Sequence, residues 1–171
     1  MKDYSSLSDS DFSKAINNSD ESAFEAFYFR YYKSLYRFIW SRTRSTEQAR
    51  EIVQETFIRL WEIRSKLVPH KSIKAYLYRI GYNLYLNHLR SKKILKKYLD
   101  KQQHNTSQDN IELQTSIHIA LEKLPEKLRV VFILNHLEGF KYAEIAETCG
   151  ISVKTVESRM GKALRILREE L

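Results

Sequence analysis

The sequence predicts an all-α protein of two small helical domains joined by a flexible linker. Only four glycines and two prolines occur in 171 residues, and no long alternation of β-branched residues is present. Apolar residues instead recur at the three- and four-residue spacing of amphipathic helices. A polar, unpatterned stretch at residues 100–110 separates two such regions, as a linker would. We therefore expect a first domain at 1–93, a linker at 94–110 and a second domain at 111–171.

The composition favours a polyanionic partner. The chain carries a net charge of +8 and a pI of about 9.5, which suits nucleic acid or an anionic membrane. Its one cysteine, Cys149, excludes an internal disulfide and fits a reducing compartment. No apolar run approaches the roughly 18 residues of a membrane span, and the first residues lack the apolar core of a signal peptide. We expect a cytoplasmic protein without membrane insertion.

The first helices are expected to form a core. Residues 9–16 predict a short helix, and Ser19-Asp20-Glu21 resembles the start of a longer one, with acids near the positive end of the helix dipole. Apolar residues then track a helical period for about four turns. We expect this stripe to be buried: Phe24, Phe27, Tyr28, Tyr31, Leu35, Phe38 and Ile39.

A further helix is predicted at residues 47–66, opened by Ser45 and Thr46. At about 100° per residue one arc is apolar and is expected in the core: Ala49, Ile52, Val53, Phe57, Leu60 and Ile63. The other side presents Gln54, Glu55, Ile58, Arg59, Trp61 and Glu62. Single exposed apolar residues are common and usually carry no function. Ile58 and Trp61 therefore leave two interpretations open: ordinary surface residues, or a docking face for another protein.

Positive charge is concentrated in one segment. No acidic residue occurs between Glu62 and Asp100, whereas ten lysines and arginines do, so the basicity is local. Five tyrosines interleave them, and the expected core stripe is Ile73, Leu77, Ile80 and Leu84, which leaves Tyr78, Tyr82 and Tyr85 off it.

Cations neutralise phosphates, and aromatic faces stack on unpaired bases at roughly 1–3 kcal/mol each. The segment therefore suits single-stranded or opened nucleic acid. The alternative is a solvated helix whose tyrosines pack at the edge of the core. A membrane-surface role for its end is disfavoured, because its charges surround the helix rather than share one face.

The second domain is expected to begin near Ile111. Its first helix has the stripe Ile117, Ala120, Leu121 and Leu124. Pro125 suits the first turn of the next helix, which Gly139 ends. The apolar residues of that helix are Leu128, Val131, Phe132 and Leu137.

The last part of the chain has a helix-turn-helix layout. A short helix with Tyr142, Ile145 and Ala146 on one side is followed by Gly150, which tolerates positive φ, and by Ser152 as an N-cap. The final helix has one apolar stripe, Val153, Val156, Met160, Ala163, Leu164 and Leu167. The N-terminal half of such a second helix enters the DNA major groove. An ordinary αα-hairpin with a solvated basic face is the alternative.

Several motifs together resemble bacterial RNA polymerase sigma factors of the extracytoplasmic-function type, within the sigma-70 family. Residues 47–61, EQAREIVQETFIRLW, resemble the region that docks on the polymerase clamp. Residues 76–83, YLYRIGYN, resemble the segment that melts and reads the minus-ten element. LPEKLR at 124–129, YAEIA at 142–146 and TVESR at 155–159 match region four. Their order and spacing make the resemblance specific over nearly the whole chain.

The resemblance implies a role for each surface. Domain 1–93 would be sigma region 2, with the polymerase-binding face Gln54, Glu55, Ile58, Arg59, Trp61 and Glu62. Its minus-ten residues would be Tyr76, Arg79, Tyr82 and Asn83. Domain 111–171 would be region 4, contacting the minus-thirty-five element through Ser152, Lys154, Thr155, Ser158, Arg159 and Lys162. The implied partners are core RNA polymerase, promoter DNA and an anti-sigma factor.

Two other classes of protein are alternatives. A helix-turn-helix regulator that binds DNA without polymerase would need a self-association surface. An enzyme is a poorer fit, because the five histidines are scattered and no glycine-rich phosphate loop or nucleophile motif occurs. We expect no catalytic residue, metal ion, cofactor or small-molecule substrate.

Overall fold

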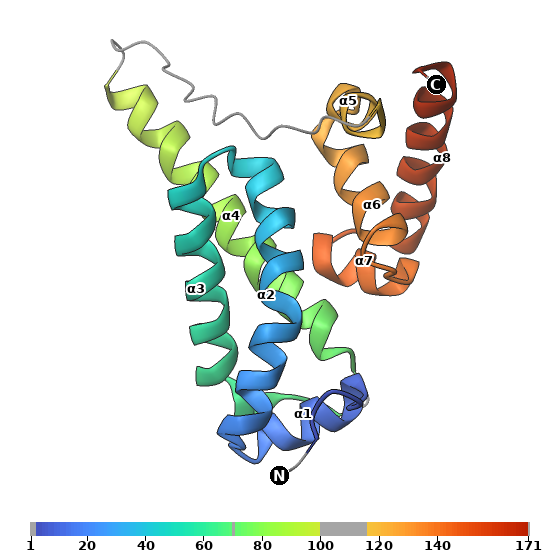
Figure 1. Cartoon of the computed structure of the whole chain (residues 1–171). Helices are drawn as coiled ribbons and strands as arrows, with labels where there is room; N and C mark the ends of the chain where they lie inside the picture. Colours follow the sequence, from blue (N-terminus) through green and yellow to red (C-terminus); the bar gives the residue numbers. More distant parts are fainter. Residues whose placement is uncertain (1–2, 70, 100–115, 171) are drawn as a thin grey trace. The chain divides into compact units, whose positions relative to one another are not determined.

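A computed structural model describes residues 3–69, 71–99 and 116–170 (Figure 1). The chain divides into two compact units, Met1–Asp109 and Asn110–Leu171. Every regular element among the described residues is helical, which confirms the predicted all-α class. None of the described helices is both long and apolar enough to cross a membrane.

The first unit is a helical bundle whose helices begin at short polar side chains. It contains α1 (Asp9–Asn17), α2 (Glu21–Thr43), α3 (Thr46–Glu62) and α4 (Ile73–Tyr98). Ser8, Asp20, Ser45 and Ser72 each accept a hydrogen bond from the backbone N–H three residues later, which satisfies one free donor of the new helix. The predicted starts at Asp20 and Ser45 are confirmed. The third helix was predicted to reach residue 66, but it ends at Glu62 and a 3₁₀ turn, Arg64–Lys66, follows.

The apolar stripe of α2 is one of the faces that form the core of this unit. Phe27, Leu35, Phe38 and Ile39 are buried as predicted, whereas Phe24, Tyr28 and Tyr31 are only half-buried. These last three lie at the rim, where the rings of Phe24 and Tyr28 meet Phe57 of α3 at 6.3 and 4.7 Å between centroids. The apolar stripe of α2 therefore extends beyond the part of the helix that the neighbouring helices bury.

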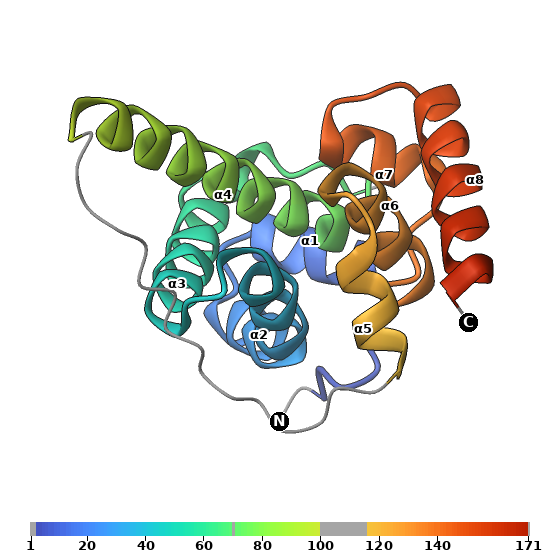
Figure 2. The same cartoon turned by 90° about the horizontal axis from the view of Figure 1, so that it is seen from above.

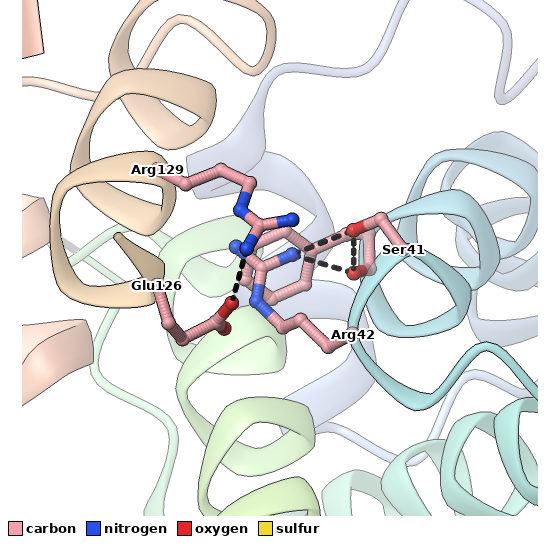
Figure 3. Close-up of polar contacts among 5 residues, drawn as sticks. Ser41, Arg42, Glu126 and Arg129 are labelled. Carbon is pink, nitrogen blue, oxygen red and sulfur yellow. Dashed lines mark hydrogen bonds and ion pairs between the residues drawn. The ribbon is translucent and has the colours of Figure 1, made fainter. Parts of the chain in front are cut away.

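The C-terminal turn of α2 is held by its own arginine. The Arg42 guanidinium lies 3.9 Å from the Phe38 ring centroid, and its Nη1 donates to Phe38 O at 2.7 Å and to Ser41 Oγ at 2.8 Å (Figure 3). A cation there favourably meets the negative end of the helix dipole. Arg44 then takes a left-handed conformation, φ 52°, and its N–H bonds to Trp40 O.

Gly81 is a point of close packing between α4 and its neighbours. A Cβ at this position would lie 3.3 Å from Leu35 Cδ1 of α2 and 3.3 Å from Thr56 Oγ1 of α3. The buried Thr56 hydroxyl donates to Ile52 O at 2.6 Å, which satisfies it within its own helix. The glycine thus allows three helices to meet at one point, and this contact sets the orientation of the outer face of α4.

The end of α4 projects beyond the bundle (Figures 1 and 2). Lys92 Nζ donates to Gln48 Oε1 of α3 at 2.7 Å, and the helix then continues to Tyr98 with residues 91–99 all exposed. Residues 94–98 of the expected linker 94–110 are therefore helical. Residues 100–110, the polar part of that segment, lie outside the described residues.

In the residues that the structure describes, the second unit is a small bundle of four helices. It contains α5 (Ser116–Lys123), α6 (Glu126–His136), α7 (Tyr142–Cys149) and α8 (Val153–Glu170). Its core joins both ends of the domain: Ala120, Leu121 and Leu124 pack with Ala163 and Leu167. Lys123 and Glu170 form an ion pair between α5 and α8. The side chain of Ile117, which was predicted in this core, lies outside the described side chains.

The start of α6 agrees with the sequence, and its end does not. Pro125 is the N-cap of α6, and Arg129 Nη2 pairs with Glu126 Oε2 at 3.4 Å within its first turn (Figure 3). The helix ends at His136, three residues before Gly139, whose φ of 73° makes the turn. Leu137, the last of the apolar residues assigned to this helix, is 62% exposed, because it lies where the chain leaves the helix.

Candidate functional site

The turn between α7 and α8 has the geometry of a helix-turn-helix. Gly150 ends α7 in the left-handed conformation, φ 65° and ψ 38°, and its N–H bonds to Ala146 O. Ser152 then accepts a hydrogen bond at its Oγ from Thr155 N at 3.1 Å, so the predicted N-cap of α8 is confirmed. The Ser152 and Thr155 hydroxyls are also 2.8 Å apart, which holds both at the exposed start of the helix.

One side of α8 is buried and the other is polar. Val156, Met160, Ala163 and Leu167 are buried as predicted, whereas Leu164 is only half-buried. Val153 was predicted in this stripe, but it is 42% exposed, because the first residue of α8 extends past the helices that cover the rest.

The six candidate residues lie around the N-terminal half of α8. Ser152, Lys154, Ser158 and Lys162 are exposed, and Thr155 and Arg159 are half-buried. They supply hydroxyls and cations, which can bond to base edges and phosphates. Two neighbours change this surface: Glu157 adds an exposed negative charge, and a Cβ at Gly161 would meet no atom within 4 Å, so the helix is bare there.

The minus-ten candidates lie on the outer side of α4. Tyr76, Arg79 and Asn83 are exposed, and their spacing of three and four residues places them on one face. Tyr82 is half-buried beside this face; its ring centroid lies 6.3 Å from Phe38 and 6.1 Å from Tyr85. The face combines an aromatic ring, a guanidinium and an amide, which can stack on a base, bind a phosphate and bond to a base edge.

Two of the five tyrosines in the basic segment are not available to a ligand. Tyr78 is fully buried against Phe38, at 5.2 Å between centroids, and Tyr85 is 8% exposed. The interpretation of the tyrosines as stacking groups is wrong for these two, and the edge-of-core alternative is right. The reason is that α4 packs on α1, α2 and α3 together, so its buried arc is wider than the four-residue stripe predicted for it.

The polymerase-binding candidates form the exposed side of α3. Gln54, Glu55, Arg59 and Glu62 are exposed, and Ile58 remains 58% exposed among them. Trp61 differs, because it is half-buried: its ring lies 4.9 Å from that of Phe24, and the Arg64 guanidinium covers it at 4.2 Å. Ile58 is thus the exposed apolar centre of this face, and Trp61 forms its edge.

The sequence analysis missed two exposed apolar features. Phe29 of α2 is 71% exposed beside Tyr28, at 5.6 Å between ring centroids. The projecting end of α4 exposes Ile94, Leu95, Tyr98 and Leu99. Both features lie outside the buried apolar stripes of their helices. Apolar residues at positions outside those stripes were the sequence signal that could have identified them.

Groups of metal-ligating side chains do not occur in the described part of the chain. Within residues 3–69, 71–99 and 116–170, no three His, Cys, Asp or Glu side chains lie close enough to hold a metal ion.

Comparison with known proteins gives matches to both units. The family model for sigma-70 region 2 matches residues 27–94, and the model for sigma-70 region 4 matches residues 114–167. The chain is 27% identical to the ECF RNA polymerase sigma factor SigW of Bacillus subtilis (strain 168), over 92% of this chain and 94% of SigW. It is 30% identical to the ECF RNA polymerase sigma factor EcfG of Rhodopseudomonas palustris (strain TIE-1), over 76% and 75%.

The fold also matches a solved structure. The chain resembles the sigma factor RpoE in its complex with the anti-sigma factor NepR from Bartonella quintana, with a TM-score of 0.71 and 24% identity. The match covers 86% of this chain and 95% of RpoE. At this identity, the likeness concerns the fold.

Proposed function

The chain belongs to the sigma-70 family of RNA polymerase sigma factors, in its extracytoplasmic-function type, and from this membership we propose that it directs core RNA polymerase to a subset of promoters. It recognises the minus-thirty-five and minus-ten elements and melts the second. As a specificity subunit it is a DNA-binding regulator, and the polymerase carries out the chemistry. Because its partners are core polymerase and promoter DNA, we place it in the cytoplasm.

One observation carries the residue assignments: a single chain presents three exposed surfaces of different chemistry. The face of α3 is mixed acidic, basic and apolar, the face of α4 is aromatic and basic, and the start of α8 carries hydroxyls and cations. A protein that grips a large enzyme, opens base pairs and anchors on duplex DNA needs these three kinds of surface.

The α3 face is assigned to the polymerase. Ile58 supplies the apolar centre that a protein interface desolvates, and Glu55, Arg59 and Glu62 supply a charged rim that selects register and partner. Gln54 and the half-buried Trp61 complete the face. Since Trp61 already packs on Phe24, it serves as a fixed wall of the surface and does not insert into the partner.

The α4 face is assigned to the opened minus-ten element. Asn83 would hydrogen-bond an extruded base of the non-template strand, and Tyr76, Tyr82 and Arg79 would line the pocket around it. Extrusion of a base costs a few kcal/mol, which stacking and hydrogen bonds can offset. The half-buried Tyr82 ring packs beside Phe38 and Tyr85. Its position is therefore already fixed before a base binds, and one edge of the ring can contact the base.

The α8 face is assigned to the minus-thirty-five element. Lys154 and Lys162 would neutralise phosphates, whereas Arg159 and Ser158 are placed to reach base edges. Ser152 and Thr155 serve first as the cap of α8, and this role presents their hydroxyls to the DNA backbone.

An anti-sigma factor is the partner proposed to hold the chain inactive. The similar RpoE chain was solved in complex with the anti-sigma factor NepR, which supports this class of regulator for the present protein.

Run-off transcription with core polymerase and a heparin challenge tests the proposal. We expect a promoter-specific product with the wild-type chain and none with Glu55→Lys, whose circular dichroism should be unchanged because Glu55 is exposed. Glu25→Lys, on the exposed side of α2, is the matched control and should transcribe normally. Normal transcription by Glu55→Lys would overturn the α3 assignment.

The comparisons do not favour a regulator that binds DNA without polymerase. The same preparation separates the two functions: tight promoter binding by a dimer of the chain alone, with no product when core enzyme is added, would restore that alternative.

A further inference from the structure

The projecting end of α4 exposes more apolar surface than the fold uses. Four apolar side chains follow Lys92, whose Nζ donates to Gln48 of α3: Ile94 and Leu95 are each 58% exposed, Tyr98 is 84% exposed and Leu99 is 65% exposed. The helix continues for six residues past Lys92, about 9 Å at 1.5 Å per residue. Neither the proposed polymerase face nor the proposed promoter faces include these residues.

These side chains lie on one side of the helix. At about 100° per residue, Ile94, Leu95, Tyr98 and Leu99 fall within an arc of about 140°. The rest of the circumference is basic, with Arg90, Lys92, Lys93, Lys96 and Lys97. The expectation that charges surround this end of the helix is therefore wrong: the apolar and basic residues occupy different sides.

The edges of the apolar arc carry cations. Arg90 and Lys97, seven residues apart, lie along one edge, and Lys92 and Lys96 lie along the other beside Leu99. Apolar residues flanked by charges with this repeat form the seam by which one helix packs along another. The apolar stripe selects a helix, and the flanking cations select acidic residues on it.

We propose that the end of α4, residues 90–99, is a docking seam for an acidic amphipathic helix of a second protein. This site is independent of the roles proposed for α3 and α8. Its charge and its shape both point to that partner, and all ten residues are exposed within the described part of the first unit.

Other occupants fit the seam less well. A second copy would bring five cations against five, which repel. Duplex DNA would take up the cations and leave the apolar arc uncovered. An anionic membrane would cover the apolar arc, but four apolar side chains within two turns offer it little area to bury, and membrane binding scales with that area.

A designed peptide provides the direct test. The probe is a fluorescein-labelled three-heptad peptide with Leu at positions a and d and Glu at e and g, so that it does not pair with itself. Binding to the full-length chain is followed by fluorescence anisotropy. We expect binding that weakens with added salt, as an ion-paired rim requires. A peptide with Lys at e and g should bind at least about tenfold more weakly.

Two sets of variants locate the site. Replacement of Ile94, Leu95, Tyr98 and Leu99 by Ser should reduce peptide affinity by about tenfold or more, because it removes the apolar seam. The matched control, Lys93→Gln, changes the cation that lies opposite the apolar arc and should alter affinity by less than about threefold. All five side chains are exposed, so thermal unfolding should stay unchanged in both sets.

Several outcomes would overturn the proposal. Equal peptide binding by the serine variant would show that the seam is not the site. Dimerisation that the serine variant loses, or sedimentation with phosphatidylglycerol vesicles in place of peptide binding, would assign the seam to another occupant. Loss of core-polymerase affinity in the serine variant would assign it to the enzyme. Glu55→Lys tests the α3 face separately, so failure of one proposal leaves the other standing.

Discussion

Arg59 Nη2 donates to Glu55 Oε1 at 2.6 Å across one turn of α3, with both side chains half exposed. An exposed pair at this spacing stabilises a helix by only about 0.3–0.5 kcal/mol. The pair is therefore available to exchange its internal bond for bonds to a partner. In the free chain the pair places both charges beside Ile58, at the rim of the proposed polymerase face.

A charge swap separates the stability of this pair from its recognition role. Glu55→Arg combined with Arg59→Glu keeps an ion pair in the helix, so the free energy of unfolding should change by less than about 0.5 kcal/mol. The same swap inverts the charges offered to polymerase, and affinity for core enzyme should fall by about tenfold or more. Urea unfolding and a core-binding titration measure the two effects. Unchanged core affinity would move the docking face elsewhere.

The two helical glycines should respond to substitution in opposite directions. Gly81→Leu forces a side chain between Leu35 and Thr56, and overpacking of this kind costs about 1–3 kcal/mol. Gly161→Ala meets no atom within 4 Å and should stabilise the chain by up to about 1 kcal/mol, because alanine favours the helix. Urea denaturation of both variants decides the point. A stable Gly81→Leu protein would mean that α2, α3 and α4 can separate without loss of the fold.

Tyr76 and Tyr78 are two residues apart and should behave differently. Tyr76→Ala removes an exposed ring, so stability should hold while promoter opening weakens by about 1–3 kcal/mol, the value of one stacked base. Tyr78→Ala empties a fully buried site and should cost about 3–5 kcal/mol of stability. Permanganate reactivity of promoter thymines reports opening, and urea unfolding reports stability. Normal opening by Tyr76→Ala holoenzyme would remove this ring from the proposed pocket.

Lys162 and Arg159 should differ in how they affect promoter binding. Lys162→Gln removes a phosphate contact, so it should weaken binding on all promoters and reduce the salt slope of log affinity by about 0.9. Arg159→Ala should instead reduce the discrimination between bases at one base pair by about 1–3 kcal/mol. Holoenzyme binding to a set of upstream-element variants, at several salt concentrations, distinguishes them. An unchanged salt slope for Lys162→Gln would mean that this lysine does not contact a DNA phosphate.

Acid should weaken the N-terminal helix through Asp11. The hydrogen bond from the Ser8 hydroxyl, at 2.6 Å, and a second from the Ser8 N–H hold the pKa of Asp11 below its usual 3.8. The lowered pKa means that the folded chain favours the carboxylate, so this stabilisation is present above about pH 4 and is lost as the pH falls through the folded pKa. The difference in urea midpoint between wild type and Asp11→Asn should shrink from pH 6 to pH 3. A constant difference would mean that the capping bonds do not depend on the charge.

Features that depend on bonds within a few residues could be predicted from the sequence. Ser45 and Ser152 were identified as helix caps, and Gly150 as a left-handed turn, because each needs only its own side chain and the next backbone N–H groups. The buried faces of α3 and α8 were largely predicted for a similar reason, since apolar residues at a regular helical spacing fall on one face of the helix.

Burial at the edges of those repeats depended on contacts from elsewhere in the chain. Tyr78 is core because three helices pack around α4, whereas Tyr76, two residues earlier and on the opposite side of the helix, is 36% exposed. Trp61 is half-covered because Phe24 of α2 reaches it, and Val153 is exposed because no helix does. The open seam at residues 90–99 follows from α4 being longer than its neighbours. Periodicity specifies which side of a helix is apolar, but only packing determines how far along and around the helix that side is covered.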